Sequence, residues 1–429
     1  MLRNVEHTRL RNGAQVVSAR SEDAESVSVG IFIGVGGRHE PAPLSGVCHF
    51  IEHMLFKGTK RRSALDISRA IEGRGGYLNA YTAESSTCYY ARLPHEYLRE
   101  GFDVLSDMYC NATLSPADME KERLVILEEL RMYRDLPQQV VQEKFTEALW
   151  PGHPLGRPLA GTETTLQNLT QKALAEFKAG AYLPGNTLFA FTGRNIDHAA
   201  CARLASDAIG NRPAKTLAAP RRVTEGIKQT PLVVTRKPAL EQVHLVVGHR
   251  IFGRRDERRH ALRLLNVILG ENMSSRLFQV VRERHGCAYA IQSGYQLHAE
   301  TGSFAVSAGL DRNRALRALG LIQRELQKMR DTRVSAAELR RTLDYTLGAF
   351  RLGLEGVGNQ MAWLGDSVLN HGRVVMPEEV IDRLRAVTLD DIRDVAQHIF
   401  DPDRLTLSVV VPEDHPVTDG QWREACGLA

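Results

Sequence analysis

The sequence lacks several features that would place it in a specialised class of protein. No apolar run reaches the roughly 18 residues of a membrane-spanning helix. The N-terminal stretch has neither a hydrophobic signal core nor a long Arg- and Ser-rich transit segment. A net charge of +4 is too small to indicate a dedicated nucleic-acid binder. The six cysteines form no C-x-x-C pair, so we expect them to be buried and reduced in a cytoplasmic protein.

What remains is the composition of a globular protein with more than one domain. The chain has 429 residues, of which 43% are hydrophobic and 25% charged. A stretch near 211–231 is rich in Pro, Ala, Lys, Arg and Thr and has no amphipathic period, which is typical of a linker. We therefore expect an N-terminal domain over 1–212, a linker over 213–231 and a C-terminal domain over 232–429.

A faint internal repeat relates the two halves. Ser115 with Asp118, and Ser335 with Glu338, form the capping signature of a helix start, and the two signatures lie 220 residues apart. Alternating strand-like runs precede the helices in each half, at 26–35 and 86–93 in the first and at 240–250 and 303–310 in the second. The pattern predicts an α+β protein of two repeated domains, each a mostly antiparallel sheet packed with helices.

The segment GVCHFIEHMLFKG, residues 46–58, carries the strongest chemical signal. Its apolar residues recur at helical spacing, and Gly58 is the expected stop. His49 and His53 are four residues apart, so both imidazoles lie on one helix face and can converge on a metal. Glu52 beside them completes H-x-x-E-H, the inverted zinc-protease motif, in which the Glu is the general base. The alternative is a surface helix with two solvated histidines.

A zinc site of this kind needs a third protein ligand. In the helix expected from Pro116, Glu122 and Glu129 follow a 3-4-3-4 stripe together with Met119, Ile126 and Tyr133. A carboxylate on an apolar stripe is costly unless it is paired or bound to a metal. Glu129 is therefore the candidate third ligand and Glu122 a candidate partner to a ligating His. An ordinary salt-bridged helix is the alternative, and Glu128 is expected to be solvated.

These residues carry a family resemblance. GVCHFIEHMLFKGT, followed about 75 residues later by ERLVILEELRMYRDLP, resembles the M16 (pitrilysin-type) metallopeptidases, in particular the short-chain branch that contains the β subunit of mitochondrial processing peptidase and its bacterial homologues. The resemblance implies one Zn²⁺ per chain, held by His49, His53 and the Glu that lies 76 residues after His53, which is Glu129. It also implies that Glu52 is the base and that Glu122 takes the accessory acidic position.

The resemblance extends along the whole chain. GGYLNAYTAESSTCYY resembles the edge strand on which the family pairs the substrate backbone, with Asn79 and Ala80 nearest the scissile bond. MSSRLFQVVRERHGCAY resembles the segment that supplies a catalytic Arg and Tyr, here Arg282 and Tyr289. Without the zinc motif, a solvated Arg and a core Tyr would be the simpler interpretation. Ala349 occupies the repeat position of Glu129, so the second half should hold no zinc.

Three departures from the family pattern matter. Cys48 stands where a small residue is usual, and this thiol could make an enzyme sensitive to thiol reagents. Cys287 replaces a common Leu. The acidic pair with which the processing peptidase recognises a substrate Arg corresponds here to Gln139 and Glu143, which puts strict Arg selectivity in doubt.

The expected function is zinc-dependent endopeptidase action on unfolded peptides or extended protein segments. The resemblance implies a chamber of four such domains, so a two-domain chain should dimerise, with Arg282 and Tyr289 supplied by the partner chain. A homodimer is the simplest arrangement, and a heterodimer with an inactive paralogue remains the alternative.

A non-catalytic structural or peptide-binding homologue is the rival function, although such proteins typically lose a ligand or the base. The motif order and the position of Glu129 argue against an H-E-x-x-H protease. The sequence does not identify the physiological substrate.

Overall fold

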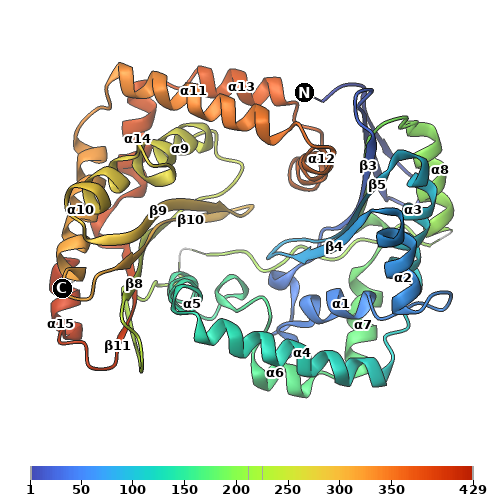
Figure 1. Ribbon diagram of the computed structural model, residues 1–429, viewed down its shortest axis with the longest axis horizontal. Helices are drawn as coiled ribbons and strands as arrows, with labels where there is room; N and C mark the ends of the chain where they lie inside the picture. The colour runs from blue at the N-terminus through green and yellow to red at the C-terminus, as the bar shows by residue number, and fades with distance from the viewer. Residues whose placement is uncertain (1, 211, 225, 428–429) are drawn as a thin grey trace. The chain divides into compact units, whose positions relative to one another are not determined.

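The computed structural model describes residues 2–210, 212–224 and 226–427. They form two compact units, each with one β-sheet and its own covering helices (Figure 1). The first unit is built from the described parts of 1–130, 158–221 and 350–379, and the second from those of 131–157, 222–349 and 380–429. Two α+β units with repeated architecture confirm the predicted fold class.

The units differ from the expected contiguous domains 1–212 and 232–429 because each takes a segment from the other half of the chain. Helix α5 (Pro137–Leu149) packs on the second sheet, and helix α12 (Val357–His371) packs on the first. Both helices are amphipathic, and each covers a sheet face that would otherwise expose apolar side chains. Residues 1, 211, 225 and 428–429, which the expected divisions include, lie outside the described residues.

The first sheet has six strands in the order β1-β2-β6-β3-β5-β4. Its strands are β1 (Val5–Arg9), β2 (Gln15–Arg20), β3 (Ser26–Ile33), β4 (Tyr77–Thr82), β5 (Thr87–Pro94) and β6 (Thr187–Gly193). The β2–β6 pair is parallel and the other pairs are antiparallel. β3 is central and almost wholly buried because helices cover both faces of the sheet. β4 is an edge strand.

The helices of the first unit lie mainly on one face of its sheet. They are α1 (Val47–Leu55), α2 (Ala64–Ile71), α3 (Leu98–Asn111), α4 (Pro116–Asp135, to Leu130), α6 (Glu163–Asn168), α7 (Gln171–Ala181), α8 (His198–Ile209) and, from the other half, α12 and the first residues of α13 (Pro377–Arg385). On the opposite face α12 lies close to the sheet because Gly365 leaves room for the Phe32 ring. A Cβ at position 365 would collide with that ring.

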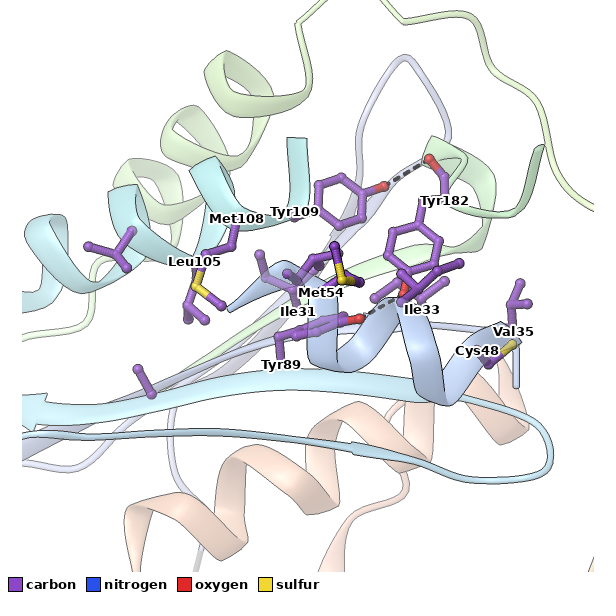
Figure 2. Close-up of a cluster of buried hydrophobic side chains, with 14 of the residues drawn as sticks. Ile31, Ile33, Val35, Cys48, Met54, Tyr89, Leu105, Met108, Tyr109 and Tyr182 are labelled. Atoms are coloured by element: carbon purple, nitrogen blue, oxygen red, sulfur yellow. Dashed lines mark hydrogen bonds between the residues drawn. The ribbon is translucent and has the colours of Figure 1, made fainter. Parts of the chain in front are cut away.

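Helix α1 is embedded in the core of the first unit. Figure 2 shows Cys48 and Met54 of α1 among aliphatic side chains of β3 and α3, next to three tyrosines. The Tyr89 and Tyr182 hydroxyls are 2.8 Å apart, and the Tyr109 hydroxyl donates to the Tyr182 carbonyl at 3.1 Å. These polar groups satisfy each other inside the apolar cluster that packs around α1.

The second sheet has five strands in the order β7-β11-β8-β10-β9. Its elements are β7 (Leu232–Lys237), β8 (Val243–Phe252), β9 (Ala288–Leu297), β10 (Thr301–Leu310), β11 (Leu405–Pro412), α5, α9 (Arg259–Asn266), α10 (Ala315–Asp331), α11 (Ala336–Gly353, to Ala349), α14 (Leu389–Ile399), α15 (Asp419–Ala425) and two π-helical segments at Val267–Glu271 and Phe278–Arg284. Only β7–β11 is parallel. β9 is again an edge strand, and β8, β10 and β11 are in the centre.

The predicted repeat is confirmed at the two helix starts. The Asp118 N–H donates to the Ser115 hydroxyl, and the Glu338 N–H donates to the Ser335 hydroxyl, each at 3.1 Å. Helices α4 and α11 therefore begin at equivalent positions of the two halves. None of the helices in the described ranges is both long enough and apolar enough to cross a membrane.

Candidate metal centre

Helix α1 carries the H-x-x-E-H motif on its half-buried side. Its apolar residues face the core, which leaves His49, Glu52 and His53 on the less buried face. The helix ends at Leu55, earlier than the predicted stop, because Gly58 with φ 130° already forms a β-bridge to Ser63. The motif residues all lie within the helix, so the predicted one-face geometry is confirmed.

The start of α1 is fixed by Glu40, which the sequence analysis did not identify. This buried carboxylate accepts the Gly46 N–H and the Cys48 N–H, both at 2.8 Å. It satisfies two of the free N–H groups at the helix N-terminus and places negative charge at the positive end of the helix dipole. Glu40 lies outside any periodic pattern, so no sequence signal marks it.

His49, His53 and Glu129 converge. Glu129 Oε2 lies 3.8 Å from His49 Nε2 and 3.7 Å from His53 Nε2. One ligand atom from each residue lies within 4.8 Å of the others, and the described parts of the chain hold no second group of this kind. Two bonds of roughly 2.1 Å at a tetrahedral angle separate ligand atoms by roughly 3.4 Å, so the spacing and the donor set fit zinc.

Glu122 and Glu129 come from the predicted stripe of α4. Met119 and Ile126 on the same stripe are buried, as is Glu122 with 6% of its surface exposed, while Glu129 is half-buried. The stripe therefore faces α1, as its spacing predicted. Ala349, at the repeat position of Glu129, is exposed on α11.

Glu122 joins His53 to a residue that the sequence analysis missed. Its Oε2 lies 3.2 Å from His53 Nδ1, and its Oε1 lies 2.7 Å from Lys57 Nζ. A carboxylate on Nδ1 orients the imidazole and leaves Nε2 to face Glu129. Lys57 lies four residues after His53, just beyond the end of α1. This spacing could have indicated that the Lys57 side chain lies on the same side as His53.

His49 is neutral near pH 7. Burial, together with the nearby His53 ring, lowers the pKa of His49 to about 4, and the Glu129 carboxylate only partly opposes this. The rings of His49 and His53 meet edge to face with centroids 4.7 Å apart. His49 Nδ1 is buried without a hydrogen-bond partner among the described residues. A neutral imidazole offers a nitrogen lone pair to a metal without first losing a proton.

Glu52 is held from the edge strand. Its Oε2 accepts a hydrogen bond from the Thr82 hydroxyl at 2.5 Å. Burial raises the pKa of Glu52, while the Thr82 hydrogen bond and the His53 ring oppose the rise. A carboxylate whose pKa lies above its ordinary value is better suited to accept a proton. Thr82 lies 30 residues from Glu52 in the chain, and nothing in the sequence connects the two.

Asn79 and Ala80 lie on β4, at the open edge of the first sheet. They pair with Tyr90 and Tyr89 of β5 on the inner side. The Ala80 N–H donates to the Asn79 side-chain oxygen at 2.8 Å. This N–H is therefore not used by the β4–β5 ladder and points to the free edge, where an extended chain could be added.

Arg282 and Tyr289 lie in the second unit and contact each other. The Arg282 guanidinium lies over the Tyr289 ring, 5.8 Å from its centroid. Tyr289 is the extra residue of a β-bulge on the edge strand β9, and 76% of its surface is exposed. The alternative of a core Tyr is therefore wrong.

The departures from the family pattern have clear structural settings. Cys48 is buried, and burial with the neighbouring Glu40 carboxylate raises the pKa of its thiol, so it is a poor nucleophile. Cys287 is also buried and hydrogen-bonds to the His285 carbonyl. Gln139 and Glu143 are exposed on α5, one helical turn apart.

Comparison with known families gives two matches that together span most of the chain. Residues 15–163 match the insulinase family of peptidases, family M16. Residues 168–345 match the peptidase M16 inactive domain. The insulinase family match in the first half therefore covers His49, His53 and Glu129.

Individual relatives agree with these matches. A protein of Streptomyces coelicolor named as an uncharacterized zinc protease is 36% identical to this chain. The alignment covers 95% of this chain and 90% of that protein. Zinc protease YmxG of Bacillus subtilis is 32% identical, with 97% of it and 94% of this chain covered. Among solved structures, a protease from Helicobacter pylori superposes with a TM-score of 0.88 at 22% sequence identity. The match covers 96% of this chain and 100% of the Helicobacter chain. The M16 inactive domain from Pseudomonas fluorescens also has a TM-score of 0.88, at 18% identity, over 95% of this chain and 98% of its own.

Proposed function

The chain belongs to peptidase family M16, and from this premise we propose that it is a zinc-dependent endopeptidase that cleaves unfolded peptides or extended protein segments. The observation that carries the proposal is the convergence of His49, His53 and Glu129 around one point. Two imidazoles and one carboxylate leave a coordination position open, as catalytic zinc sites do. Curated relatives named as zinc proteases support the choice of metal.

The residues around the cluster divide the work of peptide hydrolysis. When bound there, zinc would act as a Lewis acid on the substrate carbonyl and would make water acidic enough to yield a nucleophile near neutral pH. Glu52 accepts the proton of the attacking water and returns it to the leaving amine. Thr82 holds the Glu52 carboxylate in place, and Glu122 orients His53.

The substrate is proposed to bind as an added strand on β4. An extended segment would displace the Asn79 side chain from the Ala80 N–H and take over that donor. Backbone pairing of this kind requires an unfolded segment and is largely independent of sequence. With Gln139 and Glu143 exposed on α5 and one of the two neutral, we expect weak selectivity for Arg.

Arg282 and Tyr289 are proposed to contact the substrate and to stabilise oxyanion charge. Their mutual stacking and exposure on an edge strand support a binding role. We propose that a homodimer brings this pair from one chain to the metal cluster of the other, which gives one zinc site per chain. A heterodimer with an inactive paralogue would serve the same purpose.

All six cysteines are free, which supports a reducing, cytoplasmic location.

The test is cleavage of a quenched, unstructured peptide of about 20 residues by the wild-type protein and by Glu52→Gln, with zinc measured in both. Removing the base while keeping the ligands should reduce turnover by at least about 100-fold and leave about one zinc per chain. Glu128→Gln, next to Glu129 but on the exposed side of α4, is the matched control and should retain activity. A protein that binds zinc without cleaving any peptide indicates that a partner chain is missing. Absence of both zinc and cleavage contradicts the proposal.

A further inference from the structure

The second unit contains a cavity of about 300 Å³ that the peptidase mechanism does not use. One wall is a face of α10 that includes Gln323, Arg324 and Arg330, and the floor includes Phe400 and Leu405, next to β8. This volume is at the lower end of the range for small-molecule sites.

The arginines that line this cavity lack partners. Neither Arg324 nor Arg330 forms a side-chain hydrogen bond or an ion pair with any described residue, and Arg330 Nε is buried. Most other arginines of this unit contact carboxylates or carbonyl oxygens, as Arg276 does with Glu338 at 2.7 Å. Among the described residues, no Asp or Glu lines the cavity. Asp401, which acts on His249 electrostatically and pairs with Arg404, is the nearby acid. Two guanidinium groups that have no ion pair of their own at one concave site favour an anion.

A third polar group at the cavity comes from β8. His249 has 2% of its surface exposed, and its Nδ1 has no hydrogen-bond partner among the described residues. Burial lowers the pKa of His249 to about 4, and the backbone and the charge of Asp401 only partly oppose this. His249 is therefore neutral near pH 7, and this lining residue offers its unpartnered Nδ1 for a hydrogen bond at the cavity.

These three chemical features specify a ligand. We propose that the cavity binds a small organic carboxylate that has an apolar ring and a hydroxyl group. The carboxylate would pair with Arg324 and Arg330, the ring would pack on Phe400 and Leu405, and the hydroxyl would donate to His249 Nδ1. Binding at this site does not depend on the metal cluster or on peptidase activity.

Isothermal titration with 3-hydroxybenzoate tests the proposal, with 3-hydroxybenzamide and benzoate as comparison probes. We expect 1:1 binding of 3-hydroxybenzoate with a Kd on the order of 0.1 mM. The neutral amide should bind at least about tenfold more weakly, because the arginines then lack an anionic partner. Benzoate, which lacks the hydroxyl, should bind several-fold more weakly.

The variants Arg324→Gln and Arg330→Gln should each weaken binding about tenfold. Arg340→Gln, on the exposed face of α11, is the matched control and should bind as wild type does. Because Arg324 is exposed, its variant should fold normally, and thermal melting of each variant checks this. No saturable binding, equal binding of the amide, or unchanged binding by Arg324→Gln overturns the proposal. Loss of peptidase activity alone has no bearing on it.

Discussion

Glu122 contacts His53 on the ring nitrogen opposite to the one that faces Glu129. Its Oε2 lies 3.2 Å from His53 Nδ1, while His53 Nε2 lies 3.7 Å from Glu129 Oε2. The second oxygen of Glu122 pairs with Lys57 at 2.7 Å. Glu122 thus contacts the His53 imidazole with one oxygen and the Lys57 ammonium with the other. Such a carboxylate favours one tautomer and one orientation of the imidazole ring, as a metal site requires.

We predict that this chain of contacts sets the zinc affinity. Glu122→Gln should weaken zinc binding by about 10- to 100-fold, because a neutral amide supports the His53 ring less well than a carboxylate. Lys57→Met should weaken it less, because Glu122 remains charged but loses its second anchor. Competition against a chromogenic chelator measures both. Lys60→Met, which changes an exposed lysine nearby, should leave the zinc affinity unchanged. Equal affinities in all variants would show that Glu122 and Lys57 have no role in the site.

The Thr82 hydroxyl is predicted to determine the acid limb of the pH–rate profile. Its hydrogen bond favours ionised Glu52 against the effect of burial. Thr82→Val removes this donor, so the pKa of Glu52 should rise and the acid limb of kcat/KM should move to higher pH. At the pH of the wild-type midpoint we expect a loss of up to about tenfold. Thr82→Ser, which keeps the hydroxyl, should restore the wild-type profile. A shift to lower pH would contradict this role.

The sequence predicted that His49, His53 and Glu129 come together, because the signal for this cluster is short-range or periodic. His49 and His53 are one turn apart, and Glu129 lies on a stripe that only one face of α4 can form. Glu40 and Thr82 act on α1 from segments with no periodic relation to it, so a single sequence does not indicate them. Their roles follow from tertiary packing.

The exchange of α5 and α12 escaped the sequence analysis for a related reason. An amphipathic pattern shows which face of a helix is buried, but does not show which sheet covers that face. The strands near 26–35, 86–93, 240–250 and 303–310 were all confirmed, because alternation along a strand is a local property. The sheet on which each exchanged helix packs depends on complementary shape, as with Gly365 and Phe32.

The packing of α12 gives a stability prediction with an internal control. Gly365→Ala adds a Cβ that collides with the Phe32 ring, and should destabilise the protein by about 1–3 kcal/mol. Gly358→Ala lies on the same helix, where an added Cβ meets nothing within 4 Å. It should be neutral or stabilising by up to about 1 kcal/mol. Urea unfolding of the two variants measures the difference, and equal midpoints would contradict the close approach of α12 to the sheet.

His249 gives a pH dependence of stability. Its pKa is lowered to about 4 in the folded protein, whereas the unfolded chain has the ordinary value of about 6.5. Between these values the unfolded state binds more protons, so stability falls as the pH decreases from 6.5 towards 4. For this group alone the loss at pH 5 relative to pH 7 is about 2 kcal/mol.

Urea unfolding of wild type and His249→Gln at both pH values isolates this contribution. The variant should lose less stability between pH 7 and pH 5 than wild type does. His7→Gln, which changes an exposed histidine on β1, is the control and should follow wild type. A variant that loses as much stability as wild type would show that His249 titrates normally in the folded protein.

The most direct test of the central claim is an anomalous difference map, recorded at the zinc absorption edge, from crystals grown with zinc. We predict one peak per chain, within about 2.0–2.2 Å of His49 Nε2, His53 Nε2 and a Glu129 carboxylate oxygen. A fourth position should remain open to solvent or substrate. A zinc peak elsewhere, or no peak at these three residues in fully zinc-loaded crystals, would contradict the assignment of the metal centre and of the chemistry built on it.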